Sequence, residues 1–462
     1  MSPQPGPLFA VSPLDGRYAD RTAPLREYAS EAALMRARVR VEVEYLLALS
    51  DIDVVPLDVD PELVESLRDT YRDFGADEAE LVKQIETTGT RGYGPTNHDV
   101  KAVEYFLRER TPECLHPWLH FGLTSEDVNN LAYRLLIGDA MESVVLPALR
   151  TVRESLVEMA REYASLPMLA RTHGQPATPT TFGKEMAVFA SRLGRATGSI
   201  ADAIDSLGGK LAGASGTYAA HHVAYPTIDW RSFAASFVES LGLEFIPLTT
   251  QVNPGDDLAS LFDAIRRANR VLIDLDRDMW LYVSQRYLGQ ESDPEETGSS
   301  TMPHKVNPID FENSEGNLSK ANSDLSFLGS SITTSRLQRD LSDSTIKRNI
   351  GGALAYCLLG YTKTAEGLDT VVPNEVVMAE DLRENPAVLA EAVQTILRRE
   401  GHADAYELVK DATRGETLTM EDFDAVVDEL DVPESVATEL RSLDPEEYVG
   451  LGAELASSVE EE

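Results

Sequence analysis

DDLASLFDAIRRANRVLIDLDRDMWLYVSQRYLG, the stretch from Asp256 to Gly289, contains no Pro, and its only Gly is the last residue. Apolar residues recur along it at the three- and four-residue spacing of a helix with one buried face. A helix of this length exceeds the roughly 8 to 20 residues that are usual in globular proteins. The stretch therefore predicts a bundle of long helices that is wider than the core of one chain.

Helical patterns continue on both sides of this stretch, and they predict an all-α fold. The longer ones lie at 23–50, 124–141, 147–166, 178–207 and 343–371, the last of which tolerates Gly351 and Gly352. The strongest strand-like signal is the Gly-rich stretch 208–228, where we expect a hairpin or a compact loop. After Val371 the helical patterns become shorter and are separated by Pro and Gly.

The length and these changes of pattern predict several domains. A chain of 462 residues is too long for one ordinary core. We expect an N-terminal helical domain at 1–113 and a C-terminal helical domain at 370–462. Between them we expect a central long-helix bundle at 114–369, which includes a loop at 298–308.

The composition is that of a globular protein, with 42% hydrophobic residues. No stretch approaches the roughly 18 apolar residues that a membrane span needs, and the N-terminus lacks the pattern of a signal peptide. Cys114 and Cys357 are the only cysteines, and their separation indicates reduced thiols rather than a disulfide framework. We therefore expect a cytoplasmic protein with no membrane partner.

The formal net charge of −37 is extreme, and it is spread along the chain. Only nine of the 41 basic residues are Lys. An acidic, Lys-poor surface resembles proteins of salt-loving organisms, because at about 1 M salt the screening length falls to about 3 Å. The alternative is an ordinary acidic protein. Either interpretation makes nucleic acid an unfavourable partner, since phosphate backbones bind basic patches.

Four blocks interrupt the amphipathic pattern with polar residues near helix ends, and together they hold four of the eight His. They are TNHDVKAVEYF (96–106), HFGLTSEDVNN (120–130), RTHGQPATPTT (171–181) and GSSTMPHKVNP (298–308). Each has a structural alternative, because a His or a hydroxyl at a helix end is usually a cap or a core residue, and a Gly-Ser-Ser loop is often a linker.

No cofactor is expected from these blocks. The His lack the spacing of a metal site, and neither a phosphate loop nor a convincing dinucleotide fingerprint is present. The residues alone indicate an all-helical enzyme that gathers His, Ser, Lys and Arg at helix ends for an anionic substrate.

Taken together, the blocks resemble a known family. GSSTMPHKVNP resembles the signature loop of the fumarase/aspartase superfamily, whose members eliminate fumarate from succinyl-type substrates. His304 before Lys305, together with SPLDGRYAD (12–20), resembles the longer bacterial-type branch of the adenylosuccinate lyase family. The resemblance runs from Ser12 almost to the C-terminus and weakens after Val371.

The resemblance implies a β-elimination that releases fumarate from adenylosuccinate, giving AMP, and from the related succinyl-carboxamide intermediate of purine synthesis (SAICAR), giving AICAR. It assigns Ser299 as the base and His173 as the acid. An unactivated hydroxyl is a very weak base. The sequence shows no residue that would activate it, although backbone N–H groups of the Gly-rich loop and Lys305 could stabilise an alkoxide.

The resemblance also assigns substrate contacts. Phosphate and nucleotide contacts are implied for Arg17, Tyr18, Arg339, Ser344, Thr345, Ile346, Lys347 and Arg348. Contacts to base, ribose or carboxylates are implied for Asn97, His98, Asp99, Thr124, Ser125, Gln251, Ser300, Lys305, Val306, Asn307 and Asn313. His98 could instead be structural.

The superfamily further implies a homotetramer whose active sites are shared between chains. Two alternatives stay open at this point. One is a sister lyase that acts on argininosuccinate or malate, and the other is a non-catalytic, crystallin-like scaffold.

Overall fold

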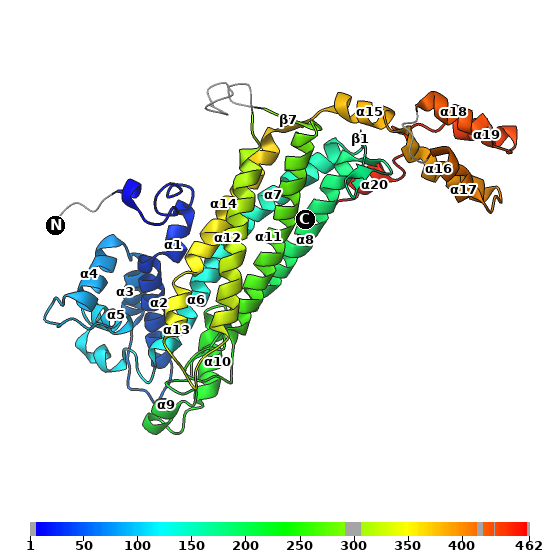
Figure 1. The fold of residues 1–462 in the computed structure, drawn as a ribbon. Helices are drawn as coiled ribbons and strands as arrows, with labels where there is room; N and C mark the ends of the chain where they lie inside the picture. Colours follow the sequence, from blue (N-terminus) through cyan, green and yellow to red (C-terminus); the bar gives the residue numbers. More distant parts are fainter. Residues whose placement is uncertain (1–5, 292–305, 414–418, 429, 460–462) are drawn as a thin grey trace. The chain divides into compact units, whose positions relative to one another are not determined.

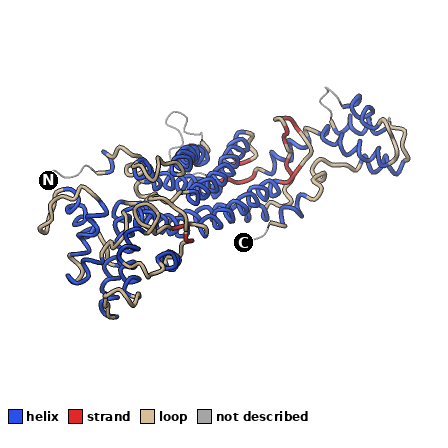
Figure 2. The backbone as a smooth tube through the Cα atoms, turned by 90° about the horizontal axis from the view of Figure 1, so that it is seen from below, coloured by secondary structure: helices blue, strands red, loops and turns tan. Residues whose placement is uncertain are grey.

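The computed structural model describes residues 6–291, 306–413, 419–428 and 430–459. These residues are predominantly helical, with a few very short strands (Figure 2), so the all-α prediction is confirmed. They form two compact units, each assembled from three segments of the chain. The first unit comprises Met1–Leu149, Ala196–Asn269 and Asn317–Gly360, and the second comprises Arg150–Arg195, Arg270–Gly316 and Tyr361–Glu462. The division at 113 and 369 stays a prediction.

The long helices predicted from the sequence are present (Figure 1). They include α7 (Leu146–Glu162), α8 (Phe182–Asp205), α11 (Asp256–Ser284) and α14 (Ile350–Thr370), and α12 (Ile309–Ile332) is a further long helix outside the predicted ranges. In the first unit, Asn269 of α11 donates to the side-chain oxygen of Asn322 of α12 at 3.0 Å. Gly360 of α14 packs there against Leu318, where an added Cβ would lie only 2.4 Å from the leucine side chain. These close approaches hold the helices of the bundle together.

The other helices of the first unit have at most 20 residues, which is the length of α2. They are α1 (Arg26–Ala29), α2 (Glu31–Ser50), α3 (Pro61–Arg72), α4 (Ala76–Thr87), α5 (Asp99–Arg108), α6 (Ser125–Ala140), α9 (Ala219–Ala224), α10 (Trp230–Ser240) and α13 (Ser342–Lys347). Helix α2 packs against α3, α5 and α6, and it begins where the Ser30 side chain accepts from the Ala33 N–H. The buried apolar face of α2 thus fixes the starts of α5 and α6, which carry candidate site residues.

Two of the predicted helices are divided, and the one at 23–50 is interrupted at Ser30, which has an extended backbone between α1 and α2. The pattern at 343–371 predicted a single helix, but α13 ends at Lys347 and α14 begins at Ile350. The reason is Asn349, whose side-chain amide donates to the backbone oxygens of Thr345 and Ile346 at 3.3 Å each. An Asn that binds carbonyls of the preceding turn competes with the helical hydrogen bonds. The break leaves Arg348 at a helix end.

The strands form four two-stranded pairs among the described residues. Antiparallel pairs join β1 (Pro167–Met168) to β4 (Thr180–Thr181), β2 (Arg171–Thr172) to β3 (Gln175–Pro176), and β7 (Leu288–Gln290) to β8 (Val371–Pro373). The Gly-rich stretch 208–228 is not a hairpin, because β5 (Gly208–Gly209) pairs in parallel with the distant β6 (Glu244–Phe245), and the rest of the stretch is a loop that contains the short helix α9.

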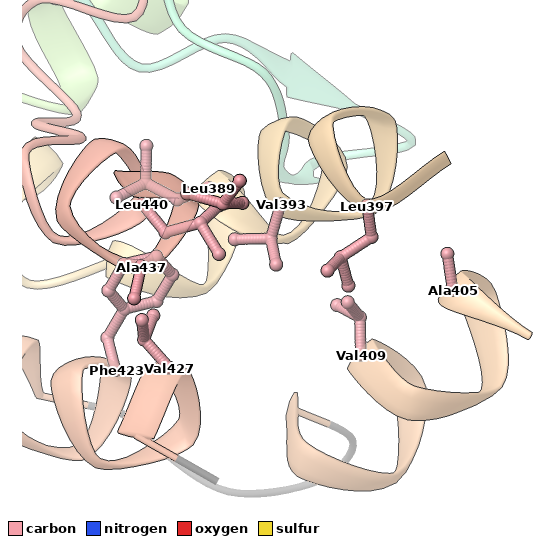
Figure 3. Close-up of a cluster of buried hydrophobic side chains, with 10 residues drawn as sticks. Leu389, Val393, Leu397, Ala405, Val409, Phe423, Val427, Ala437 and Leu440 are labelled. Atoms are coloured by element: carbon pink, nitrogen blue, oxygen red, sulfur yellow. The ribbon is translucent and has the colours of Figure 1, made fainter. Parts of the chain in front are cut away.

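The C-terminal part of the second unit contains α15 (Glu375–Arg383), α16 (Ala390–Arg399), α17 (Ala405–Thr413), α18 (Met420–Asp428), α19 (Glu434–Arg441) and α20 (Gly452–Ser457). Of these, α16, α17, α18 and α19 share their own hydrophobic core (Figure 3), whereas α15 contacts β1 and α20 contacts β4. Leu397, Phe423 and Leu440 are at most 3% exposed in this core. No helix among the described residues is long and apolar enough to span a membrane.

Candidate active site

The start of α5 carries the first group of candidate residues. His98 caps the helix, since its Nδ1 accepts from the Lys101 N–H at 3.3 Å. The neutral ring therefore carries its proton on Nε2, which lies 3.4 Å from the Oγ of Ser125. Asn97, just before the cap, has a φ of 48°, which non-glycine residues rarely adopt. This turn directs His98 toward the start of α6.

Asp99, the first residue of α5, lies between two arginines. Arg38 of α2 donates to its carboxylate at 2.7 Å, and Arg348 lies 3.6 Å from it. Burial alone would raise the pKa of Asp99, but the charge and hydrogen bond of Arg38 and the Val100 N–H lower it below its ordinary value. Asp99 is therefore an anion that holds Arg348 near the start of α5.

The start of α6 carries Thr124 and Ser125. The Thr124 N–H donates to the Asp127 carboxylate at 2.8 Å, which closes the helix N-terminus. The Thr124 hydroxyl accepts from the Gln251 amide at 3.3 Å, and the Gln251 oxygen lies 3.5 Å from Arg339. Three segments far apart in the sequence thus meet at one helix end.

Two residues of the run 344–348 have different surroundings. Lys347 is 6% exposed and lies 2.8 Å from both Glu126 and Asp343, so its charge is already paired inside the protein. Arg348 is 57% exposed and keeps most of its donors toward solvent. Of these two, Arg348 is the cation with donors available to an anionic ligand.

Arg17 and Tyr18 lie in a segment of turns, which Thr22 stabilises by donating to Leu14 O at 3.1 Å. The preceding residues Ser12 and Asp15 line a cavity of about 580 Å³ that Arg26 and Arg348 also line. The segment that carries Arg17 therefore borders the same space as Arg348.

His173 lies in the second unit, at the tip of the hairpin formed by β2 and β3. His173 and Gly174 have φ angles of 54° and 72°, as a two-residue type I′ turn requires. The hairpin is anchored by Arg171, which donates to Asp381 of α15 at 2.5 Å. The imidazole is thus exposed at the end of a rigid support.

The signature loop is only partly described. Ser299, Ser300 and Lys305 lie outside the described residues. Val306 is exposed, and its carbonyl accepts from the Gln290 amide at 3.3 Å. Asn307 precedes α12, and Asn313 is half-buried within it. In the described part of the chain, no group of three or more His, Cys, Asp or Glu could hold a metal ion.

Sequence reasoning missed several charged residues that organise these segments. They are Arg38, Glu42, Glu126, Asp127 and Lys210, all of which are at most 4% exposed. Lys210 pairs with Asp127 at 2.7 Å, and Glu42 lies 2.5 Å from the Nδ1 of His120. A charged residue on the apolar face of a helix, such as Arg38 in α2, is the signal that could have found them.

Comparisons with known proteins agree over almost the whole chain. Residues 16–322 match a family described as lyase, and residues 335–449 match the C-terminal domain of adenylosuccinate lyase. The chain is 44% identical to adenylosuccinate lyase of Haemophilus influenzae over 98% of this chain and 99% of that protein. It is also 44% identical to the Escherichia coli and Dictyostelium discoideum adenylosuccinate lyases, over 96% of this chain and 97% of each.

Two solved structures have the same fold. A fumarate lyase from Mesorhizobium sp. BNC1 gives a TM-score of 0.73 at 20% identity and covers 95% of this chain and 97% of its own. The 3-carboxy-cis,cis-muconate lactonizing enzyme from Pseudomonas putida gives 0.74 at 21%, with 95% and 96% covered. The predicted fumarase/aspartase-like fold is thereby confirmed.

Proposed function

The chain belongs to the adenylosuccinate lyase family of enzymes, and from this premise we propose that it cleaves adenylosuccinate to AMP and fumarate. We extend the proposal to SAICAR, which would give AICAR and fumarate. The observation that carries it is the 44% identity to adenylosuccinate lyases over nearly the full chain. The donors gathered at the starts of α5 and α6 support it.

We propose that the nucleotide end of the substrate binds in the first unit. Arg348 is exposed beside Asp99, and Arg17 belongs to a segment that borders the same cavity. Guanidinium groups suit phosphate because they bind its oxygens through paired N–H donors. His98, Ser125 and Gln251 add neutral donors and acceptors that suit the base, the ribose and the carboxylates.

The elimination would use His173 and Ser299. The base removes a proton from the succinyl carbon next to a carboxylate, and the electron pair forms the double bond of fumarate as the carbon–nitrogen bond breaks. The acid protonates the departing nitrogen of AMP. A His titrates near neutral pH and suits the second task, and the exposed position of His173 on its hairpin supports this role.

We propose a cytoplasmic homotetramer with sites shared between chains. Large apolar side chains on the long helices of the second unit support assembly, since Val188, Trp280 and Leu281 are 40 to 46% exposed. Burial of these side chains against a second chain would remove their apolar surface from water. The same proposal includes the three-domain division. It also includes contacts to the substrate carboxylates from Lys305, Asn307 and Asn313.

We also propose that the protein works at high salt. The net charge of −37 would repel both neighbouring chains and a substrate with a phosphate and two carboxylates. At about 0.01 M salt this repulsion reaches about 30 Å, whereas molar salt suppresses it. Activity and tetramer mass should therefore rise together with added KCl.

One assay tests these proposals. The purified protein is incubated with adenylosuccinate, SAICAR, argininosuccinate and malate, and fumarate absorbance and oligomeric mass are measured across a KCl series. We expect turnover of the first two substrates only, with activity increasing toward molar KCl. Fumarate release from argininosuccinate or malate alone would refute the substrate assignment. Highest activity and tetramer mass in dilute buffer would refute the salt assignment.

A further inference from the structure

Glu126, in the first turn of α6, is a buried anion that no part of the proposed chemistry uses. Its side chain is 1% exposed. A carboxylate removed from water is costly unless cations pair with it. Glu126 has two such partners, because the Lys347 ammonium lies 2.8 Å away and the Arg339 guanidinium 3.4 Å away.

The two cations come from segments that carry proposed substrate contacts. Arg339 lies in the loop between α12 and α13, and Lys347 is the last residue of α13, directly before Arg348. Glu126 itself follows Thr124 and Ser125 at the start of α6. One carboxylate therefore joins the start of α6 to two neighbouring segments that lie more than two hundred residues later in the chain.

The cluster balances its charges internally. Asp343 lies 2.8 Å from Lys347, so two carboxylates face one ammonium and one guanidinium. All four side chains are less than one-fifth exposed. If the charge of Glu126 were removed, the cluster would keep an excess positive charge, and Lys347 would retain only Asp343. The segment that ends in Arg348 would then lose its attachment to α6.

Arg339 has one donor that the rest of the protein does not satisfy. Its Nε is buried and, in the part of the chain that the structure describes, has no hydrogen-bond partner. Glu126 holds one terminal nitrogen of the same guanidinium, and the Gln251 oxygen lies 3.5 Å from the other. An N–H donor without a partner on a fixed guanidinium is suited to donate to a ligand oxygen.

We propose that Glu126 is a positioning residue, which holds Arg339 and, through Lys347, Arg348 at the place where the substrate phosphate binds. This inference rests on the proposed function, in which these arginines contact the nucleotide. It also gives Lys347 a structural role in place of the direct contact that the family resemblance implied. Glu126 touches no reacting atom, so its effect should be on binding.

The test uses Glu126→Gln, which keeps the shape and removes the charge. We expect the KM for adenylosuccinate to rise about tenfold, while kcat should change by less than about threefold. The reason is that the variant weakens charged hydrogen bonds to the substrate phosphate and leaves the contacts to the reacting atoms intact. The products serve as separate probes. Inhibition by AMP, which carries the phosphate, should weaken about tenfold, while inhibition by fumarate should change less than about twofold.

The matched control is Glu62→Gln. Glu62 occupies the same position in the first turn of α3 but is exposed. The control variant therefore loses the same interaction with the helix dipole but breaks no buried ion pair. Its kinetics should equal those of the wild type. Glu126→Asp, which keeps the charge at a shorter reach, should recover part of the AMP binding, and it serves if Glu126→Gln fails to fold.

The outcomes separate this inference from the proposed function. If the wild type does not cleave adenylosuccinate, the proposed function is wrong. If the wild type is active but Glu126→Gln weakens inhibition by AMP and inhibition by fumarate equally, or weakens neither, the positioning role is wrong. If AMP and fumarate inhibit Glu126→Asp as strongly as they inhibit the wild type, the positioning role is also wrong.

Discussion

Asn97, His120 and His173 have φ angles of 48°, 58° and 54°, in the left-handed region that costs a non-glycine residue about 1 to 2 kcal/mol. Each belongs to a different polar block, and each comes at a sharp turn beside a helix or strand end. Such strain persists only where the surrounding structure fixes it, and it is frequent at functional sites. The conformation marks sharp turns and does not by itself assign a function, because the same region is adopted outside these blocks by Arg91, Tyr218, Arg286 and Leu337.

His173→Ala should reduce kcat by about 10²-fold or more, because a general acid is removed at an exposed position. The fold and oligomeric mass should not change, since the imidazole fills no core. Steady-state kinetics, circular dichroism and mass measurement test this together. His222→Ala, another exposed His, is the control and should keep full activity. Undiminished turnover by His173→Ala would exclude it as the acid.

His120 should make stability depend on pH. Burial alone would lower its pKa, but the charge and hydrogen bond of the fully buried Glu42 raise it above 6.5. A raised pKa contributes stability that is complete below about pH 6.5 and is lost as the pH rises through the folded-state pKa. Relative to His120→Gln, the wild type should therefore have an unfolding midpoint that decreases as the pH rises above about 6.5. A constant difference would contradict the pairing.

At the scale of elements, long helices could be read from the sequence and their interruptions could not. Apolar spacing predicted α11 because nothing in Asp256–Ser284 competes with the helix. The break between α13 and α14 depends on whether the Asn349 amide binds backbone carbonyls, which spacing does not reveal. The polar blocks were visible as candidates, but the burial of Lys347 and the role of Glu126 depend on contacts across the chain.

The Gly-rich stretch 208–228 is held by a buried ion pair. Lys210 and Asp127 are both fully buried, and the Asp127 carboxylate also accepts from the N–H groups of Ala212 and Gly213. This arrangement ties the loop to the start of α6. The sequence could not reveal it, because acids in a first helical turn are usual without any partner.

Lys210→Met should lower the free energy of unfolding by about 3 to 5 kcal/mol, since it leaves Asp127 as an uncompensated buried charge. Denaturant titration measures the loss. The control is Arg399→Gln, which breaks an exposed pair with Glu439 and should leave the midpoint nearly unchanged. Equal effects of the two substitutions would contradict the importance of the buried pair.

At the scale of the whole molecule, the proposed shared sites can be tested by complementation. Mixing inactive His173→Ala with inactive Ser299→Ala should restore part of the activity, because subunit exchange builds some sites in which both residues are intact. The mixture must first be shown by mass measurement to contain mixed tetramers. If mixed tetramers form and activity does not return, each site takes both residues from one chain.

The central proposal is that adenylosuccinate binds with its phosphate at Arg348 and that His173 and Ser299 act on its succinyl group. A crystal structure of the His173→Ala variant with adenylosuccinate, grown at high salt, tests it most directly. We expect the phosphate within hydrogen-bond distance of Arg348 and Arg339, and the bridging nitrogen facing the space left by the imidazole. A nucleotide bound elsewhere, or a phosphate that contacts neither arginine, would contradict the claim.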